Sequence, residues 1–129
     1  MKKYNLLVYF VMLFIMSFSV IAGANSGAIW TTNNDCGSAT QDANHYAIGA
    51  HLYINGNGFN EGTYDWEVYG NPGGSSADPN IVVASGTVNV DSTGSFCFYA
   101  YTVQPDDDGE YKFNVGGKND NYRVQGTIF

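Results

Sequence analysis

The sequence predicts an all-β domain, on three observations. Beyond its apolar first 24 residues, the chain is rich in Gly, Asn, Ser, Thr, Tyr and Val and poor in the residues that favour helices. Apolar and polar side chains alternate in short segments, with the period of two that half-buried strands require. Turn residues separate these segments about every ten residues. About seven or eight strands spaced in this way are typical of a sandwich or a small barrel.

The first element is expected to be a signal peptide at residues 1–24. Two lysines precede an apolar stretch at residues 6–21, and Ala22-Gly23-Ala24 provides the small side chains that signal peptidase requires. Cleavage there gives one domain, residues 25–129, that is secreted or displayed at the cell surface. The alternative is an uncleaved anchor, because the apolar run approaches the roughly 20 residues that span a bilayer. A membrane is expected to be contacted only through this segment.

Charge restricts the partners of the domain after this segment. Without residues 1–24, three basic side chains stand against twelve acidic ones, a formal net charge of about −9. Such a field repels nucleic acids and anionic lipid surfaces, so no nucleic-acid partner is expected. About a hundred residues bury one modest core, which predicts a single domain.

The segment 45–54 has the clearest strand pattern. Tyr46 and Leu52 fall on one face of the predicted strand, and His45 and His51 fall on the other. Six residues of strand separate the two histidines by roughly 20 Å, so they cannot share a metal ion or a proton path. No catalytic or nucleotide-binding motif is present in the sequence. No enzymatic activity and no cofactor are therefore expected.

The segment 63–68 repeats the pattern, with Tyr64, Trp66 and Val68 on one face. Between the two strands, residues 55–62 contain Asn-Gly pairs that accept positive φ, which predicts a hairpin-type connection. The other expected strands lie near residues 28–31, 81–84, 86–90, 95–103, 110–115 and 122–129. A loop with two Pro and two Gly is expected at residues 71–79.

The two cysteines of the chain, Cys36 and Cys97, are expected to form a disulfide, since an exported protein meets an oxidising compartment. The bond would close a loop of about sixty residues. On the chain-entropy argument this contributes roughly 4 kcal/mol to stability.

The motif Asp107-Asp108-Gly109-Glu110-Tyr111 resembles the start of strand F in immunoglobulin-like domains. The passage from Tyr53 to Phe59 is similar to the strand B to strand C region of IPT/TIG-type domains of surface proteins. The resemblance, which extends to fibronectin type III domains, implies a single immunoglobulin-like antiparallel β-sandwich of about seven or eight strands. It implies that Tyr111 is the tyrosine-corner residue and Trp66 the core tryptophan.

The sequence departs from true immunoglobulin domains at the second core cysteine. Phe113 stands in its place, and Cys97 lies one strand earlier. A bond between Cys36 and Cys97 would tie the N-terminal segment to the strand at 95–103 and replace the usual bridge between the two sheets.

The acidic run Asp106, Asp107 and Asp108 is one candidate metal site. Carboxylate oxygens in a loop can bind Ca²⁺ outside the cell, although the run lacks the alternating ligand spacing of an EF-hand. The alternative, which we favour, is that one Asp caps the turn before Tyr111 and the others are solvated.

Tyrosines form the candidate ligand-binding surface. In the strand at 95–103, Tyr99 and Tyr101 are expected to share the outer face, opposite two phenylalanines, and to lie near Tyr53 or Tyr69. Exposed tyrosines bind sugar rings and also form protein interfaces. The alternative is that a loop, or the N-terminal segment held by Cys36, covers them.

The expected function is therefore that of a secreted or cell-surface, non-enzymatic module acting by protein binding, adhesion or assembly through its edge strands. Its partner would be a surface protein, a glycan or a second copy of the chain. The alternative function is that of a secreted carbohydrate-binding module that uses the tyrosine face.

Overall fold

The computed structural model describes residues 27–33, 35–36 and 44–125. These residues form eight β-strands and one short 3-10 helix, arranged in two sheets, so the prediction of an all-β domain is confirmed. The expected signal peptide at residues 1–24 lies outside the described residues.

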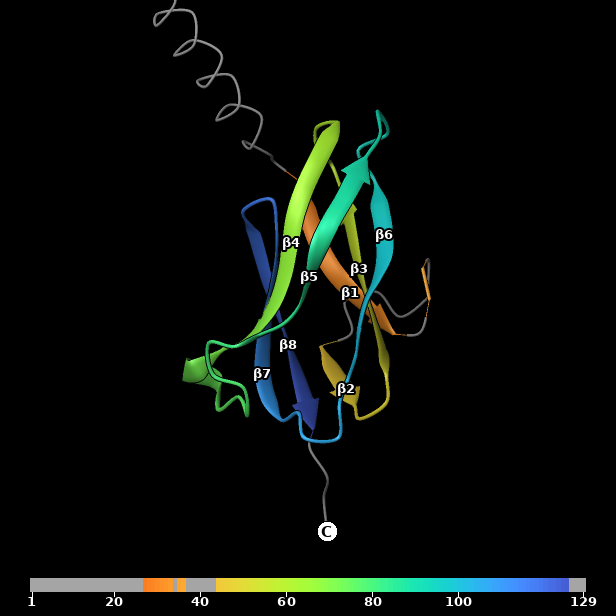
Figure 1. The fold of residues 1–129 in the computed structure, drawn as a ribbon. Helices are drawn as coiled ribbons and strands as arrows, with labels where there is room; N and C mark the ends of the chain where they lie inside the picture. Colours follow the sequence, from red (N-terminus) through yellow and green to blue (C-terminus); the bar gives the residue numbers. More distant parts are fainter. Residues whose placement is uncertain (1–26, 34, 37–43, 126–129) are drawn as a thin grey trace, which may run out of the picture.

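One sheet has three strands in the order β1-β3-β6. Its strands are β1 (Ala28–Asn33), β3 (His51–Asn57) and β6 (Phe96–Thr102). The other sheet has five strands in the order β2-β8-β7-β4-β5 and curls like a half-barrel (Figure 1). Its strands are β2 (His45–Ala47), β8 (Lys118–Gln125), β7 (Gly109–Val115), β4 (Gly62–Gly70) and β5 (Val82–Val90). Neighbouring strands are antiparallel, except that β2 runs parallel to β8.

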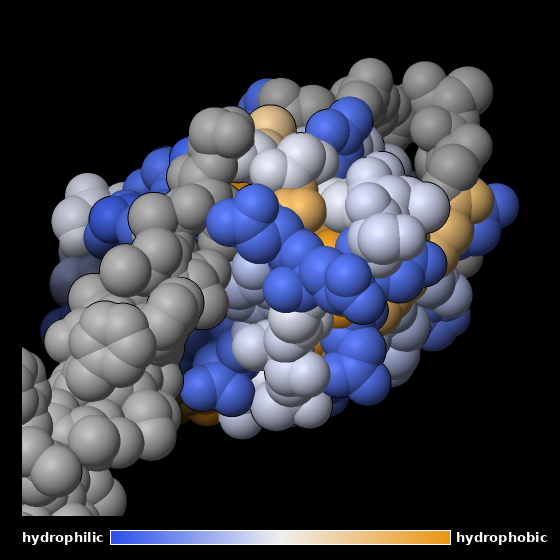
Figure 2. All heavy atoms as spheres, turned by 90° about the horizontal axis from the view of Figure 1, so that it is seen from above, coloured by the Kyte–Doolittle hydropathy of each residue, from blue (hydrophilic) through white to orange (hydrophobic). Residues whose placement is uncertain are grey.

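The core lies between the two sheets and is rich in tyrosine. Tyr111 and Tyr122 stack with their ring centroids 5.6 Å apart, and the Tyr46 ring meets Tyr122 edge to face at the same distance. The expected inward positions of β4 are occupied by Tyr64 and Val68, which are buried, and by Trp66, which is partly buried against the core. Seen from above, the described surface is mostly hydrophilic, with small hydrophobic areas between polar residues (Figure 2).

The segment 45–54 is two strands, so the prediction of one continuous strand is wrong. The chain turns at Gly49, whose φ of 89° favours glycine, and passes from the five-stranded sheet into the three-stranded one. Tyr46 and Leu52 are both buried, as the alternation predicted. His45 and His51, however, lie on strands of different sheets.

The connection at residues 55–62 is not a hairpin, because β3 and β4 belong to different sheets. Its Phe59 side chain is buried between them. The segments predicted at 81–84 and 86–90 form the single strand β5, in which Gly86 pairs with Trp66. A Cβ at Gly86 would lie 3.0 Å from the indole, so glycine leaves room for that ring without breaking the strand.

The long loop between β4 and β5 is present as predicted and contains the short helix η1 (Pro72–Gly74). The last strand begins at Lys118, four residues before the predicted start, and is described as far as Gln125. The rest of the strand predicted at 122–129 lies outside the described residues.

Candidate functional site

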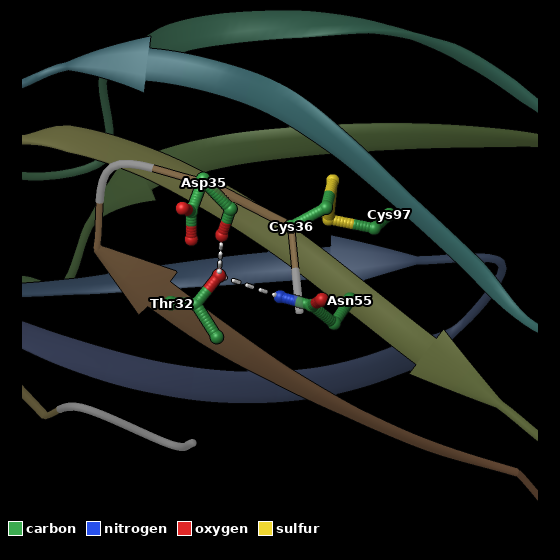
Figure 3. The surroundings of a disulfide bond; sticks show 5 residues. All are labelled: Thr32, Asp35, Cys36, Asn55 and Cys97. Carbon is green, nitrogen blue, oxygen red and sulfur yellow. Dashed lines mark hydrogen bonds between the residues drawn. A yellow bond between two sulfur atoms is a disulfide. The ribbon is translucent and has the colours of Figure 1, made fainter. Parts of the chain in front are cut away.

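A disulfide joins Cys36, in the turn after β1, to Cys97 on β6, with a Cα–Cα distance of 5.8 Å. The predicted pairing is therefore confirmed, and it ties the segment after the first strand to the three-stranded sheet (Figure 3). The bond is compatible with an extracellular location, because disulfides persist in oxidising compartments. In the described part of the chain, no helix has the length and apolar character of a membrane span.

The turn at Asp35 and Cys36 covers the middle of the outer face of the three-stranded sheet. The Thr32 hydroxyl donates to the Asp35 carbonyl at 2.8 Å, and the Asn55 amide donates to Thr32 Oγ1 at 3.0 Å (Figure 3). Both side chains are almost fully buried. The turn therefore covers Thr32 and Asn55 but not Tyr99, which remains exposed, so the prediction that the tyrosines are covered is wrong at Tyr99.

A β-bulge in β6 separates the two tyrosines that were expected to share a face. Tyr53 of β3 pairs with Tyr99, but the preceding residue, Leu52, pairs with Tyr101, so Ala100 is an extra residue. One extra residue exchanges the faces of all positions beyond it. Tyr99 stays on the outer face and is 51% exposed, whereas Tyr101 packs partly buried against the core. The prediction of a shared Tyr99–Tyr101 face is wrong.

Three exposed or half-exposed rings form what we call the aromatic cluster: His51, Tyr53 and Tyr99. The Tyr99 ring centroid lies 5.8 Å from that of Tyr53 and 5.9 Å from that of His51, with edge-to-face geometry. The Thr102 hydroxyl lies within hydrogen-bond distance of both the Tyr99 hydroxyl, at 2.5 Å, and His51 Nδ1, at 2.9 Å. The cluster is a small amphipathic surface with both ring faces and polar groups.

Tyr69, the fourth predicted ligand-binding tyrosine, lies on β4 in the other sheet, where it pairs with Lys112 and Val82. It therefore does not contribute to the aromatic cluster. Sequence reasoning missed His51 and Thr102 as members. The position of His51 on the polar side of its strand pattern was an available signal, whereas the alternation put Thr102 on the phenylalanine face and only the bulge brings it outward.

Tyr111 connects two loops at one end of the molecule. Its hydroxyl lies within hydrogen-bond distance of Asp78 Oδ2, in the loop before β5, and 3.2 Å from Asp107 Oδ1, in the loop before β7. The ring is fully buried in the core. This arrangement is similar to the expected tyrosine corner, but the acceptors are two carboxylates, and Asp78 is 33 residues away in sequence.

Asp107 is the buried member of the predicted calcium run. Its Oδ2 accepts from the Tyr101 hydroxyl at 2.7 Å and from the Gln104 backbone N–H at 2.9 Å. Burial, aided by the neighbouring Asp78 carboxylate, raises the pKa of Asp107 above its usual range. Burial likewise raises the pKa of the Tyr101 and Tyr111 phenols, so both remain hydrogen-bond donors at neutral pH.

The structure does not bring the predicted calcium ligands together. Asp106 and Asp108 are exposed, whereas the Asp107 side chain is directed into the loop network. Among the described residues, no three His, Cys, Asp or Glu side chains are grouped as a metal site would require. Asp107 instead caps the turn that precedes Tyr111, which is the alternative to calcium binding that the sequence favoured.

The side of the molecule formed by β5 and β6 carries almost no charge, and we call it the neutral side. Each strand is the last of its sheet, and the two strands contact each other (Figure 1). Between residues 79 and 105, Asp91 is the one charged residue. The apolar residues there are only partly buried: Val83, Ala84 and Val88 on β5, and Phe96, Phe98 and Ala100 on β6.

Trp66 of β4 extends into the neutral side, where its ring lies 4.9 Å from that of Phe98. Val82, at the start of β5, and the preceding Ile81 are about half exposed, at 49% and 53%. Within the part of the chain that the structure describes, the neutral side therefore combines two strand edges with which no other strand pairs and apolar side chains that are only partly buried. Comparison with protein-family models and with curated proteins gives no match for this chain.

Proposed function

We propose that this chain is an exported, non-enzymatic, immunoglobulin-like module that acts by binding another polypeptide, in adhesion or assembly, through its neutral side. The observation that carries the proposal is a pair of strand edges, on β5 and β6, with which no other described strand pairs and which carry uncharged, partly exposed apolar residues. Proteins usually protect such edges, and an unprotected one is a template for pairing with another chain.

The immunoglobulin-like part of the proposal is supported by the strand order. Strands β1, β3 and β6 would correspond to strands A, B and E, and β8, β7, β4 and β5 to G, F, C and C′. The buried ring of Tyr111 at the start of β7 and the partly buried ring of Trp66 on β4 agree with this correspondence. No described strand corresponds to D, which would pair with E, and no described strand other than β3 pairs with β6.

Retention of the protein on the surface of the cells that export it tests the proposal. The variant Ser85→Lys/Thr87→Lys places charge in the middle of the β5 edge, at two exposed positions. Ala47→Lys, on the opposite edge strand of the same sheet, is the matched control. We expect the fluorescently labelled wild type and the control to be retained, and the double variant to be lost. Equal retention of all three would refute the role of the neutral side.

A second candidate function is carbohydrate binding at the aromatic cluster, favoured by the 51% exposure of Tyr99 beside Tyr53 and His51. Aromatic rings with adjacent polar groups can stack on and hydrogen-bond to a sugar ring. A pull-down with insoluble polysaccharides tests this function. Tyr99→Ala and Tyr53→Ala should abolish retention, whereas Tyr69→Ala, in the other sheet, should not. Absence of any sugar-dependent retention of the wild type excludes it.

A further inference from the structure

The exposed edge of β5 lacks the usual protection against pairing. The strand is nine residues long, and from Ile81 to Val90 it contains no charged residue and no proline. Among the described strands only β4 pairs with it, so its other edge has unpaired backbone groups. Charged residues, proline and short strands are the devices that normally prevent edge pairing.

The opposite edge of the same sheet, β2, has such protection. It is three residues long and pairs with β8 in parallel. Beside it, His45, Glu110 and Arg123 line a polar hollow of about 250 Å³. The contrast between the two edges indicates that pairing at β5 is tolerated or used, whereas pairing at β2 is prevented.

The middle of β5 is nearly symmetric about Gly86. On either side of this glycine stand Ser85 and Thr87, and beyond them Ala84 and Val88. The first pair faces outward opposite Glu67 and Asp65 of β4, and the second faces inward opposite Val68 and Tyr64. A strand of this kind matches itself when two copies run antiparallel, because each side chain meets one of similar size on the same face.

We infer that the β5 edge binds a second copy of this chain, in an antiparallel pair whose two-fold axis passes at Gly86. Ser85 then lies opposite the partner's Thr87, and Ala84 opposite the partner's Val88. The two five-stranded sheets become one continuous sheet. This inference rests on the proposed function and specifies the polypeptide that the neutral side binds.

Charge favours a second copy at this place and disfavours one elsewhere. The chain is acidic, with a formal charge of −7, so two copies repel each other wherever their carboxylates approach. Around Gly86 the nearest carboxylates, Asp65 and Glu67, lie one strand back from the edge, and the one charged residue of the neutral side, Asp91, lies five residues away, beyond the end of β5. Across the paired strands they would be about 14 Å from those of the partner, beyond the screening length at physiological salt. Salt added above the physiological concentration should therefore change the Kd of the dimer little.

Disulfide trapping tests the register. Residues directly opposite in an antiparallel pair have Cα atoms about 5 Å apart, within the range of a disulfide. A mixture of the Ser85→Cys and Thr87→Cys proteins should therefore cross-link on mild oxidation at least ten-fold more than either variant alone. In the single variants, like positions lie about 8 Å apart and are too distant. Equal cross-linking of the mixture and the single variants, or none in the mixture, would overturn the register.

Sedimentation velocity of the exported protein from about 10 µM to 1 mM tests the dimer itself. We expect a reversible monomer–dimer equilibrium in which Ser85→Lys/Thr87→Lys raises the Kd at least ~30-fold, since it places lysine opposite lysine twice. The control Ala47→Lys should change it less than two-fold. A wild type that stays monomeric at 1 mM, or a dimer lost in the control alone, overturns the inference. Loss of cell-surface retention in the double variant would still support the proposed function in that case.

Discussion

Different interactions stabilise the neutral side and the loop end, which is the region where residues 71–80 meet residues 104–109. At the loop end the backbone N–H of Ala77 donates to the carbonyl of Asp108 at 2.9 Å, and the carboxylates of Asp78 and Asp107 meet at the Tyr111 hydroxyl. The neutral side has one charged residue in 27 and is held by ring contacts and a disulfide.

The comparison shows that carboxylates are used at the loop end and are scarce on the neutral side. Loops need polar partners for backbone groups that no neighbouring strand satisfies, and at the loop end the Asp107 carboxylate accepts from the backbone N–H of Gln104. Among the described strands, β5 and β6 of the neutral side each pair with a neighbour on one edge only. Stability should therefore depend on pH at the loop end and on covalent and apolar contacts at the neutral side.

The largest expected effect comes from removing the disulfide of the neutral side. The variant Cys36→Ser/Cys97→Ser opens a loop that spans 61 residues of sequence, and we expect the free energy of unfolding to fall by about 4 kcal/mol. Urea unfolding followed by circular dichroism measures it. The loss should be the same at pH 5 and pH 8, because no titrating group is changed. A loss below about 1 kcal/mol would contradict the importance of this bond.

An intermediate effect is expected from Tyr111→Phe at the loop end. The change removes the hydroxyl shared by Asp78 and Asp107, and should lower the free energy of unfolding by about 2 kcal/mol. Tyr122→Phe is the matched control, because the buried Tyr122 hydroxyl has no hydrogen-bond partner among the described residues. In that control the free energy of unfolding should stay unchanged or rise. Equal losses in the two variants would show that ring packing, rather than the hydroxyl, matters at Tyr111.

The smallest effect is the pH dependence of stability from Asp107. Its pKa is raised in the folded protein, so the folded state retains a proton that the unfolded state releases. The resulting contribution to stability is full below about pH 4, the ordinary range of aspartate, and is lost as pH rises through the folded pKa. Urea unfolding between pH 4 and 7 should show a decline that Asp107→Asn reduces. An identical slope in the variant would assign the decline to other carboxylates.

Much of the fold could be predicted from the period-two pattern. Tyr46, Leu52, Tyr64 and Val68 all lie buried on the faces that the alternation gives them. The pattern could not predict the change of sheet at Gly49, because alternation continues through the turn. It also missed that residues 55–62 join strands of different sheets, since Asn-Gly turns serve both kinds of connection.

The candidate surface was predictable in part. Tyr53 and Tyr99 lie together as expected, but the alternation of β6 hides the extra residue at Ala100, which directs Tyr101 inward. A bulge depends on the register with a neighbouring strand, which no local pattern records. The same holds for Asp78, whose approach to Tyr111 depends on how two distant loops fold.

The place of Trp66 gives the protein a built-in optical signal. The chain has two tryptophans, and in a Trp30→Phe variant all indole emission would come from the ring that lies against Gly86 at the β5 edge. That ring is only partly buried in the single chain. Exclusion of water from the edge would shift its emission to shorter wavelength, so occupancy of β5 becomes visible in solution without any attached label.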